Sequence, residues 1–430
     1  MKKCGFTICL IIYSITIMAQ KDNHLIESIL RKHKNPVVNQ VLNEPDKYRC
    51  QVIYTQINRD KNNKPHFTYY TYRNNPKEYF YPASTVKLPL AALSLQKLND
   101  LNIPGVDKFT TIQFDSSYEK QSAVQFDSSS ESGLPSIANY IIRAFLISEN
   151  DPYNRMYQFV GQQTINNDLH QKGYKNVRIV RQFAGLDEDQ NRHTNRVRFL
   201  DKNGKLIYTQ SAAFNTDSFD FSTSVKIGKA YMNREDSLVN EPFDFTRHNN
   251  ISLQDLSDIL RSFIFPESMP KHKRFRLKEE DYRFLRKYLS QYPSETNYPK
   301  YDTTEFYDSY VKFFFRDSTH RSMPGNIRVF NKVGWSYGFL TDVSYIIDTL
   351  HKVEFMLSAT IYANEDDILN DNNYEYESIG HPFLYALGQS IYQYELNRNY
   401  QRKPDLSNMI IRYDRRDPSD KRPPLKEVDN

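Results

Sequence analysis

The chain has 430 residues, with 57 Lys and Arg against 52 Asp and Glu and a formal net charge of +5 at pH 7. Basic and acidic residues are well mixed along the chain, which excludes the basic stripe of a nucleic-acid-binding surface. There are only 13 Gly, and both G-x-G-x-x-G and G-x-x-x-x-G-K followed by Ser or Thr are absent, which excludes the common phosphate-binding loops.

The first nineteen residues predict a secretory signal peptide. Two lysines precede an apolar run that ends near Met18, and Ala19 provides a small residue for cleavage. The run is shorter than the roughly 20 apolar residues of a membrane-spanning helix, so cleavage is favoured over a retained anchor. We therefore expect a secreted protein, periplasmic in a Gram-negative-type bacterium, with no transmembrane segment after cleavage. Only Cys50 would then remain, which leaves no disulfide within the chain.

The elements that follow predict one domain, residues 20–398. Helical spacing or apolar composition predicts helices at 23–34, 80–98, 136–147, 153–160, 252–264, 279–290 and 382–397. Alternation of apolar and polar residues predicts strands at 50–57, 66–73, 326–333, 341–348 and 352–361. This order predicts an α+β fold with a mixed five-stranded antiparallel sheet from both ends of the chain and an all-helical middle region.

Two segments, one inside this domain and one after it, differ in composition from the rest of the chain. Residues 190–250 are polar and contain the hairpin signal Asn203-Gly204, which is typical of an insertion. The tail 399–430 is charged and contains several prolines, and we expect it to be disordered.

The segment 332–338, K-V-G-W-S-Y-G, allows two incompatible interpretations. Gly334, Ser336 and Gly338 match the G-x-S-x-G nucleophile elbow, which requires a strand, a sharp turn and then a helix. The residues after Gly338 alternate as a strand does, so a hairpin with Ser336 in its turn is favoured. In the second interpretation, Lys332-Val333-Gly334 is a variant of a K-T-G triplet.

The second interpretation requires a serine and a lysine three residues apart on a helix, where the two side chains share one face. The lysine amine can then accept the serine proton, provided that burial lowers its pKa. Five Ser-x-x-Lys pairs occur: Ser84/Lys87, Ser94/Lys97, Ser117/Lys120, Ser268/Lys271 and Ser309/Lys312. Only Ser84/Lys87 begins an apolar helix directly after a hairpin, where free backbone N–H groups and the helix dipole favour a nucleophile.

A third motif, Ser148-Glu149-Asn150, follows the apolar helix 136–147 at a corner of the chain. Ser-x-x-Lys, Ser-Glu-Asn and Lys-Val-Gly, in this order, resemble the S-x-x-K, S-D-N and K-T-G motifs of the class A β-lactamases and the wider penicillin-binding-protein-like serine hydrolases. The resemblance covers roughly residues 23–397 and agrees with the predicted order of strands and helices.

The resemblance implies a role for each motif residue. Ser84 would be the acylated nucleophile and Lys87 its proton partner. Ser148 would pass a proton to the leaving nitrogen, Asn150 would bind the substrate amide, and Lys332 would hold the substrate carboxylate. The backbone N–H groups of Ser84 and Trp335 would form the oxyanion hole. Gly334, which has no side chain, would allow the substrate to approach this hole closely.

The chain departs from the family pattern in three places. Glu149 replaces Asp, and Val333 replaces Thr, which removes a hydroxyl that would help to hold the carboxylate. The E-x-x-L-N loop that carries the deacylating glutamate is absent. Asp187, which has the family's spacing to Asn191, and Glu188 are the candidate bases, and an acidic surface loop is the alternative. Without a positioned base, the acyl-enzyme would form and turn over slowly.

These observations predict a serine hydrolase that acts by acyl transfer on a β-lactam, a small-molecule or a peptidic amide. A D,D-peptidase, amidase or esterase on the same fold and a catalytically weakened envelope binding protein are the alternatives. No H-E-x-x-H motif or cysteine cluster indicates a metal, and no cofactor or nucleic-acid partner is expected. The natural substrate and the oligomeric state stay open.

Overall fold

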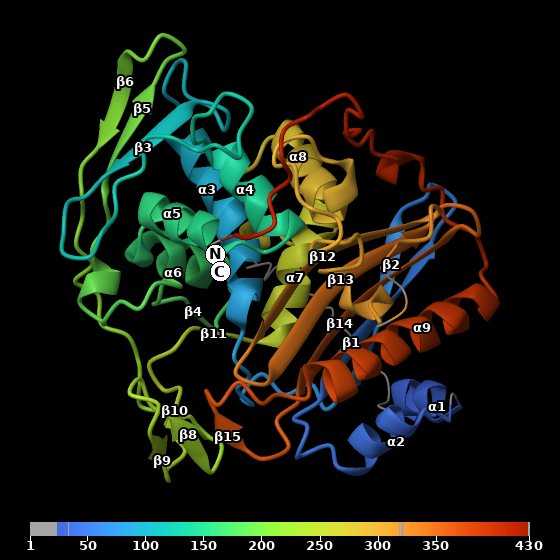
Figure 1. The fold of residues 1–430 in the computed structure, drawn as a ribbon. Helices are drawn as coiled ribbons and strands as arrows, with labels where there is room; N and C mark the ends of the chain where they lie inside the picture. Colours follow the sequence, from blue (N-terminus) through green and yellow to red (C-terminus); the bar gives the residue numbers. More distant parts are fainter. Residues whose placement is uncertain (1–23, 33, 318, 320–321, 429–430) are drawn as a thin grey trace, which may run out of the picture.

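The central feature of the protein is a five-stranded antiparallel sheet with the strand order β12-β13-β14-β1-β2. The computed structural model describes residues 24–32, 34–317, 319 and 322–428. Strands β1 (Gln51–Arg59) and β2 (Pro65–Tyr72) come from the N-terminal part of the chain. Strands β12 (Ile327–Ser336), β13 (Phe339–Asp348) and β14 (Val353–Tyr362) come from the C-terminal part (Figure 1). The predicted sheet from both chain ends is confirmed, and β12 forms one edge.

Helices cover both faces of this sheet. On one face lie α9 (His381–Asn397), α1 (His24–Lys32) and α2 (Pro36–Asn43), and the sheet contributes Val329, Val333 and Leu357 to their apolar contact (Figure 1). On the other face lie α7 (Leu253–Ile264), α8 (Glu279–Ser290) and α3 (Lys87–Leu101). Alternate side chains of β12 therefore face opposite layers of the molecule, because side chains alternate along a strand.

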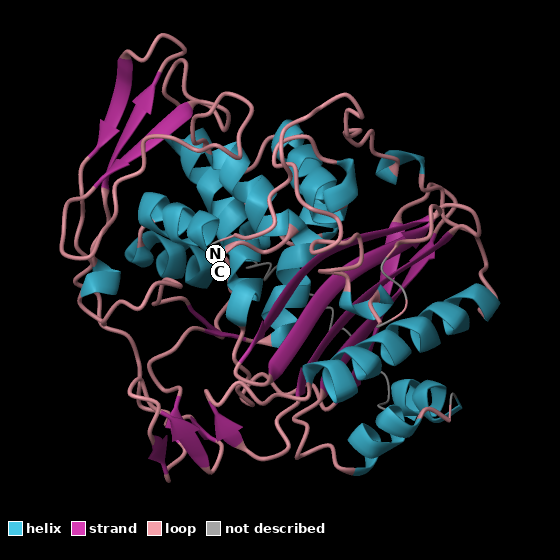
Figure 2. Ribbon diagram, viewed as in Figure 1, coloured by secondary structure: helices cyan, strands magenta, loops and turns pink. Residues whose placement is uncertain are grey.

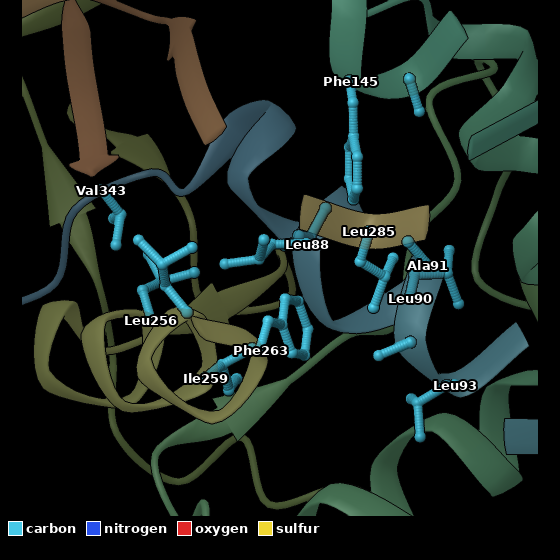
Figure 3. Close-up of a cluster of buried hydrophobic side chains, with 14 of the residues drawn as sticks. Leu88, Leu90, Ala91, Leu93, Phe145, Leu256, Ile259, Phe263, Leu285 and Val343 are labelled. Carbon is cyan, nitrogen blue, oxygen red and sulfur yellow. The ribbon is translucent and has the colours of Figure 1, made fainter. Parts of the chain in front are cut away.

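The helical region is completed by α4 (Ile137–Leu146), α5 (Asn150–Val160) and α6 (Gln162–Gln171). Its core is formed where α3, α7 and α8 meet, with Leu88, Phe263 and Leu285 among the buried side chains (Figure 3). Val343 of β13 belongs to the same cluster, so the sheet and the helices share one core. Because α3 runs through this core, the residues at its start are held firmly.

The middle of the chain also contains small sheets, so it is not all-helical as predicted (Figure 2). Strand β3 (Thr111–Asp115) pairs with β5 (Arg196–Leu200), which pairs with β6 (Leu206–Gln210). The hairpin signal at Asn203-Gly204 corresponds to the turn between β5 and β6. The other small sheets pair β4 (Val177–Arg178) with β11 (Asn250–Ile251), β7 (Lys226–Ile227) with β10 (Phe243–Asp244), and β8 (Ala230–Met232) with β9 (Leu238–Val239) and β15 (Ile368–Leu369). Several of these pairs, such as β3 with β5 and β4 with β11, join segments far apart in sequence, and such pairings leave no local periodicity.

The tail differs from its prediction of disorder. It is described as far as residue 428 and makes specific contacts with the domain. Lys287 donates to Asp414 at 2.7 Å, and Arg416 donates to the backbone carbonyls of Thr296 and Pro293 at 3.0 and 2.8 Å. The composition of the tail could not predict these contacts, because the residues that the tail contacts lie on α8 and on the loop that follows.

The predicted signal peptide, residues 1–19, lies outside the described residues. Within the described ranges, no helix is both long and apolar enough to cross a membrane. Cys50 is buried as a free thiol.

Candidate active site

The hairpin between β12 and β13 decides between the two interpretations of 332–338. Ser336 pairs with Phe339, and the two residues between them, Tyr337 and Gly338, have φ values of +52° and +78°. Positive φ at both central residues is the signature of a two-residue hairpin turn. A strand, and not a helix, follows Gly338, so Ser336 is not the serine of a nucleophile elbow.

Ser84 lies on a short 3₁₀ turn, Ala83–Val86, that leads directly into α3 at Lys87. Ala83 has φ +44°, an uncommon left-handed conformation for a residue with a Cβ. Thr85 stabilises the turn through its N–H and its Oγ1, which both donate to the Pro82 carbonyl, at 3.0 and 2.7 Å. As an early residue of the turn, Ser84 has a backbone N–H without an intrahelical acceptor. Backbone strain and a free donor are thus placed together at Ser84, the candidate nucleophile.

The Lys87 amine is fully buried and lies 2.7 Å from Ser84 Oγ. It donates to Asn150 Oδ1 at 2.8 Å and to the Ser148 carbonyl. Burial, together with the positive charge of Lys332, holds the pKa of Lys87 well below its usual range. A neutral amine has two N–H groups and one lone pair. Asn150 and the Ser148 carbonyl take the N–H groups, which leaves the lone pair for the Ser84 hydroxyl.

Ser148 lies between two lysines. Its Oγ accepts a hydrogen bond from Lys332 Nζ at 2.7 Å and lies 3.4 Å from Lys87 Nζ. The residue has φ +72°, a left-handed conformation that costs roughly 1–2 kcal/mol in a non-glycine residue. The neighbouring structure therefore has to hold Ser148 in this orientation.

Lys332 belongs to the edge strand β12 and is 2% exposed. Burial lowers its pKa to about 7, opposed by the negative charge of Asp342 and assisted by the positive charge of Lys312. Asp342 and Lys312 form a buried cluster with Asn331, which donates to Asp342 at 2.9 Å and accepts from Lys312 at 2.6 Å. The charge of Lys332 is therefore set by buried groups and changes near neutral pH.

Gly334 brings β12 against the turn that carries Ser84. A Cβ at position 334 would lie 2.5 Å from the Pro82 carbonyl oxygen and 2.9 Å from the backbone nitrogen of Ser84. Ser336 and Phe339 close the hairpin, so alternation along the ladder turns the Trp335 N–H away from β13 and toward the free edge. The N–H groups of Ser84 and Trp335 thus lie on the two segments that meet at Gly334.

The side chains of Trp335 and Val333 face the other side of the sheet. The Trp335 ring packs against Phe313 and Tyr310 with centroid distances of 5.6 and 6.0 Å. Val333 is buried in the apolar contact with α9 and is not directed at Ser84. The bulky Trp335 ring therefore does not stand between its own backbone N–H and the site. A Thr side chain at position 333 would project from the face of the sheet opposite Lys332.

The two candidate bases for deacylation lie elsewhere. Asp187 is exposed, and its Oδ1 accepts the backbone N–H of Gln190 at 2.8 Å. Glu188 is exposed and pairs with Arg247 at 2.7 Å. Both carboxylates are thus engaged at the surface of the loop, as the alternative interpretation expected, and neither contacts Ser84, Lys87 or Ser148 among the described interactions.

The residue of this loop that faces Lys87 is Phe183. Its ring centroid lies 5.4 Å from Lys87 Nζ, and the ring stacks on Tyr153 at 4.4 Å. Asn191 holds the loop in place, since its Oδ1 accepts the Gln182 N–H at 2.7 Å. The family spacing between Asp187 and Asn191 therefore identifies Asn191 as the residue that anchors the loop. It does not identify a base.

Sequence reasoning missed a buried network behind Ser148-Glu149-Asn150. Glu149 is 2% exposed and accepts hydrogen bonds from Arg143 Nε at 2.8 Å and from the Tyr301 hydroxyl at 2.5 Å. A charged Arg143 within the apolar helix 136–147 was a usable signal, because such a residue requires a partner when buried. No local pattern indicated Tyr301, which is 152 residues away from Glu149.

Comparison with known proteins agrees with this geometry. Residues 37–213 match the model of a family described as the beta-lactamase enzyme family. The match includes Ser84, Lys87, Ser148 and Asn150, and it confirms the family resemblance stated from the motifs. No curated protein shows a sequence match to the chain.

Solved structures with similar folds include several β-lactamases. One from Desulfarculus baarsii DSM 2075 is 13% identical, covering 88% of this chain and 100% of its own, with a TM-score of 0.47. One from Sphaerobacter thermophilus DSM 20745 is 11% identical, covering 87% and 98%, with a TM-score of 0.44. A class A β-lactamase from Clostridium kluyveri DSM 555 is 12% identical, covering 82% and 98%, with a TM-score of 0.45. Because these scores lie below 0.5, the fold assignment rests on the strand order and the family match.

Proposed function

We propose that this chain, a beta-lactamase-like protein by the family that matches residues 37–213, is a serine hydrolase that uses Ser84 as its nucleophile and Lys87 as its base. The observation that carries the proposal is the 2.7 Å contact between Ser84 Oγ and a fully buried Lys87 amine. The low pKa of Lys87 supports it, because a neutral amine can accept the hydroxyl proton.

The reaction begins when Ser84 Oγ attacks the carbonyl carbon of an amide and its proton moves to Lys87 Nζ. The carbonyl oxygen becomes an oxyanion that accepts the N–H groups of Ser84 and Trp335. The C–N bond then breaks, and the leaving nitrogen takes the Ser148 hydroxyl proton, which Lys87 replaces. Ser148 is suited to this relay because its Oγ lies 3.4 Å from Lys87 Nζ and 2.7 Å from Lys332 Nζ.

The proposed substrate is an amide that carries a nearby carboxylate, such as a β-lactam. Protonated Lys332 supplies the positive charge that would attract the carboxylate. Asn150, at the start of α5, has an amide side chain that is half-buried beside Lys87 and suited to the substrate amide. A peptide ending in a free carboxylate has the same two groups, so a D,D-peptidase is the second candidate.

The position of the Phe183 ring supports the expectation that the acyl-enzyme is hydrolysed slowly. In the described part of the chain, the hydrogen bonds of Ser84, Lys87 and Ser148 involve no carboxylate. The loop turns an aromatic ring toward Lys87 instead. Water that attacks the ester must then be activated by Lys87 alone, and we expect the acyl-enzyme to accumulate. The predicted signal peptide extends the proposal to a secreted, periplasmic enzyme.

Covalent labelling tests the proposal. A fluorescent penicillin should label the wild-type protein and Ser336→Ala, but not Ser84→Ala. Labelling of Ser84→Ala would contradict the assignment of the nucleophile.

Nitrocefin hydrolysis then separates turnover from trapping. A burst of about one equivalent followed by a slow steady state is expected. Fast steady-state turnover would contradict the slow deacylation, while release of D-Ala from a D-Ala-D-Ala peptide would favour the peptidase. Stable labelling with no turnover of either compound would identify a binding protein that has lost hydrolysis.

A further inference from the structure

Glu149 is the point at which the active site is tied to the rest of the fold. It lies between Ser148 and Asn150, and its carboxylate is directed away from the reacting groups into a buried site. Tyr301 donates to one oxygen at 2.5 Å and Arg143 Nε to the other at 2.8 Å. Arg143 also donates to Asp127 at 2.8 Å. Both oxygens of Glu149 are therefore held, which fixes the backbone on either side.

This restraint is needed because Ser148 is strained. Its φ of +72° is unfavourable for serine, so the segment would relax without external contacts. Relaxation would move Ser148 Oγ away from Lys332 Nζ and Asn150 Oδ1 away from Lys87 Nζ, contacts of 2.7 and 2.8 Å.

The C-terminal tail in turn holds Tyr301. Leu425 bonds to the two neighbours of Tyr301: its N–H donates to the Lys300 carbonyl at 2.8 Å, and its carbonyl accepts from Asp302 N–H at 2.8 Å. The apolar side chains of this contact form one small cluster at the end of α4. It consists of Leu146, Ile147, Tyr301 and Phe306, with Ile142, Tyr310, Leu425 and Val428 packed against them.

We propose that the C-terminal tail is a positioning element of the active site: Leu425 holds Tyr301, and Tyr301 holds Glu149, so that Ser148 and Asn150 stay in contact with the two lysines. Tyr301 and Leu425 touch no substrate and act only through the Ser148-Glu149-Asn150 segment. The inference rests on the proposed function, in that its kinetic readout is acylation of Ser84.

The chain contains a matched control for Tyr301. Tyr54 donates to the buried Glu395, whose other oxygen accepts Arg398 Nε at 2.7 Å. This second Tyr–Glu–Arg group joins β1 to α9, on the face of the sheet opposite the helical region. Tyr301→Phe and Tyr54→Phe thus remove the same kind of hydrogen bond, but only the first adjoins Ser148.

The first experiment compares the rate of labelling by a fluorescent penicillin. Tyr301→Phe should slow acylation about tenfold, as expected for loss of one hydrogen bond to a charged group, mainly through the rate constant of acylation and not through substrate affinity. Tyr54→Phe should label at the wild-type rate, although the thermal unfolding midpoint should fall by a similar amount in Tyr54→Phe and in Tyr301→Phe. Equal labelling rates for all three proteins, or equal slowing in both variants, would overturn the inference.

Amide hydrogen exchange gives a readout that does not depend on the reaction. Peptides that cover residues 144–155 should exchange faster in Tyr301→Phe than in wild type or Tyr54→Phe. If the penicillin labels none of the proteins, the proposed function fails, and the exchange result alone decides the inference. Unchanged exchange in this segment would overturn it.

The tail is tested in the full chain with Leu425→Pro, which removes the N–H that bonds to Lys300. Ile410→Pro is the control, because the Ile410 N–H donates only within the tail, to the Ser407 carbonyl at 3.2 Å. Slower labelling and faster exchange of 144–155 are expected in Leu425→Pro alone. The same effect in both variants, or in neither, would overturn the role of the tail.

Discussion

Gly334 lies directly against the backbone of Ser84. The ideal Cβ position at 334 is 2.9 Å from the nitrogens of Ser84 and Thr85 and 2.5 Å from the Pro82 carbonyl oxygen. All three atoms are backbone atoms of one turn, so they cannot yield as the end of a flexible side chain would. The absence of a side chain at 334 is what allows the edge of the sheet and Ser84 to form one site.

Gly334→Ala should therefore slow acylation of Ser84 by about 100-fold, because a displacement of about 1 Å at a reacting group has an effect of that size. The measurement is the rate of penicillin labelling. Gly325→Ala is the control, since a Cβ at 325 meets no atom within 4 Å. A Gly334→Ala protein that labels at the wild-type rate would show that the turn moves freely.

Lys87→Met should reduce the acylation rate by a factor on the order of 100 to 10,000, the range for a lost general base. The variant should remain folded, as checked by circular dichroism, since Met fills the buried space of the lysine stem. Lys97→Met is the matched control: Lys97 belongs to another Ser-x-x-Lys pair on the same helix, and its amine donates to the Val160 carbonyl at 3.4 Å. Equal losses in the two variants would argue against a special role for Lys87.

The pKa of Lys332, about 7, predicts how the reaction depends on pH. The protonated form attracts a carboxylate, and this form is lost as the pH rises through 7. Acylation by a penicillin with a free carboxylate should fall about fivefold between pH 7 and pH 8, while a penicillin methyl ester should show no such decrease. A decrease of equal size for the ester would assign the titration to another group.

Phe183→Glu should speed hydrolysis of the acyl-enzyme by more than about tenfold, because it places a carboxylate on the loop that faces Lys87. The measurement is the steady-state rate of nitrocefin hydrolysis after the burst, with Phe183→Gln as the control for size and polarity. An unchanged steady-state rate in Phe183→Glu would show that the loop position cannot deliver a base.

Asp187→Asn and Glu188→Gln should leave the same steady-state rate unchanged within about twofold. Both carboxylates are exposed and bonded to Gln190 and Arg247, not to the reacting groups. A specific decrease in either variant would return that residue to the role of base.

Much of the sheet and of the reacting set could be predicted from the chain alone. Alternation along 326–333, 341–348 and 352–361 and the helical spacing of 252–264 and 279–290 correspond closely to β12, β13, β14, α7 and α8. Ser84 and Lys87 were recognisable because they are three residues apart at the start of an apolar helix. These features depend on neighbouring residues, and a local pattern records them.

The predictions that differ from the structure depend on distant residues. Composition predicted a disordered tail, because the charged residues of 399–430 lack a core of their own. Their stability comes from partners on α8 and around Tyr301, far away in sequence. Likewise, the Asp187-to-Asn191 spacing was visible, but which side of the loop faces Lys87 depends on how Phe183 packs on Tyr153.

The order of helices and strands and the three motifs could be derived from the amino-acid sequence, because periodicity and turn residues act over a few positions. The same local patterns were enough to reject Ser336 as a nucleophile. The folded chain was needed to show that Gly334 lies against Ser84, that Phe183 and not a carboxylate faces Lys87, and that the tail bonds to the neighbours of Tyr301. The cause is the same in each case. These contacts depend on short distances between segments far apart in the chain, and burial then sets the charge of the lysines that they bring together.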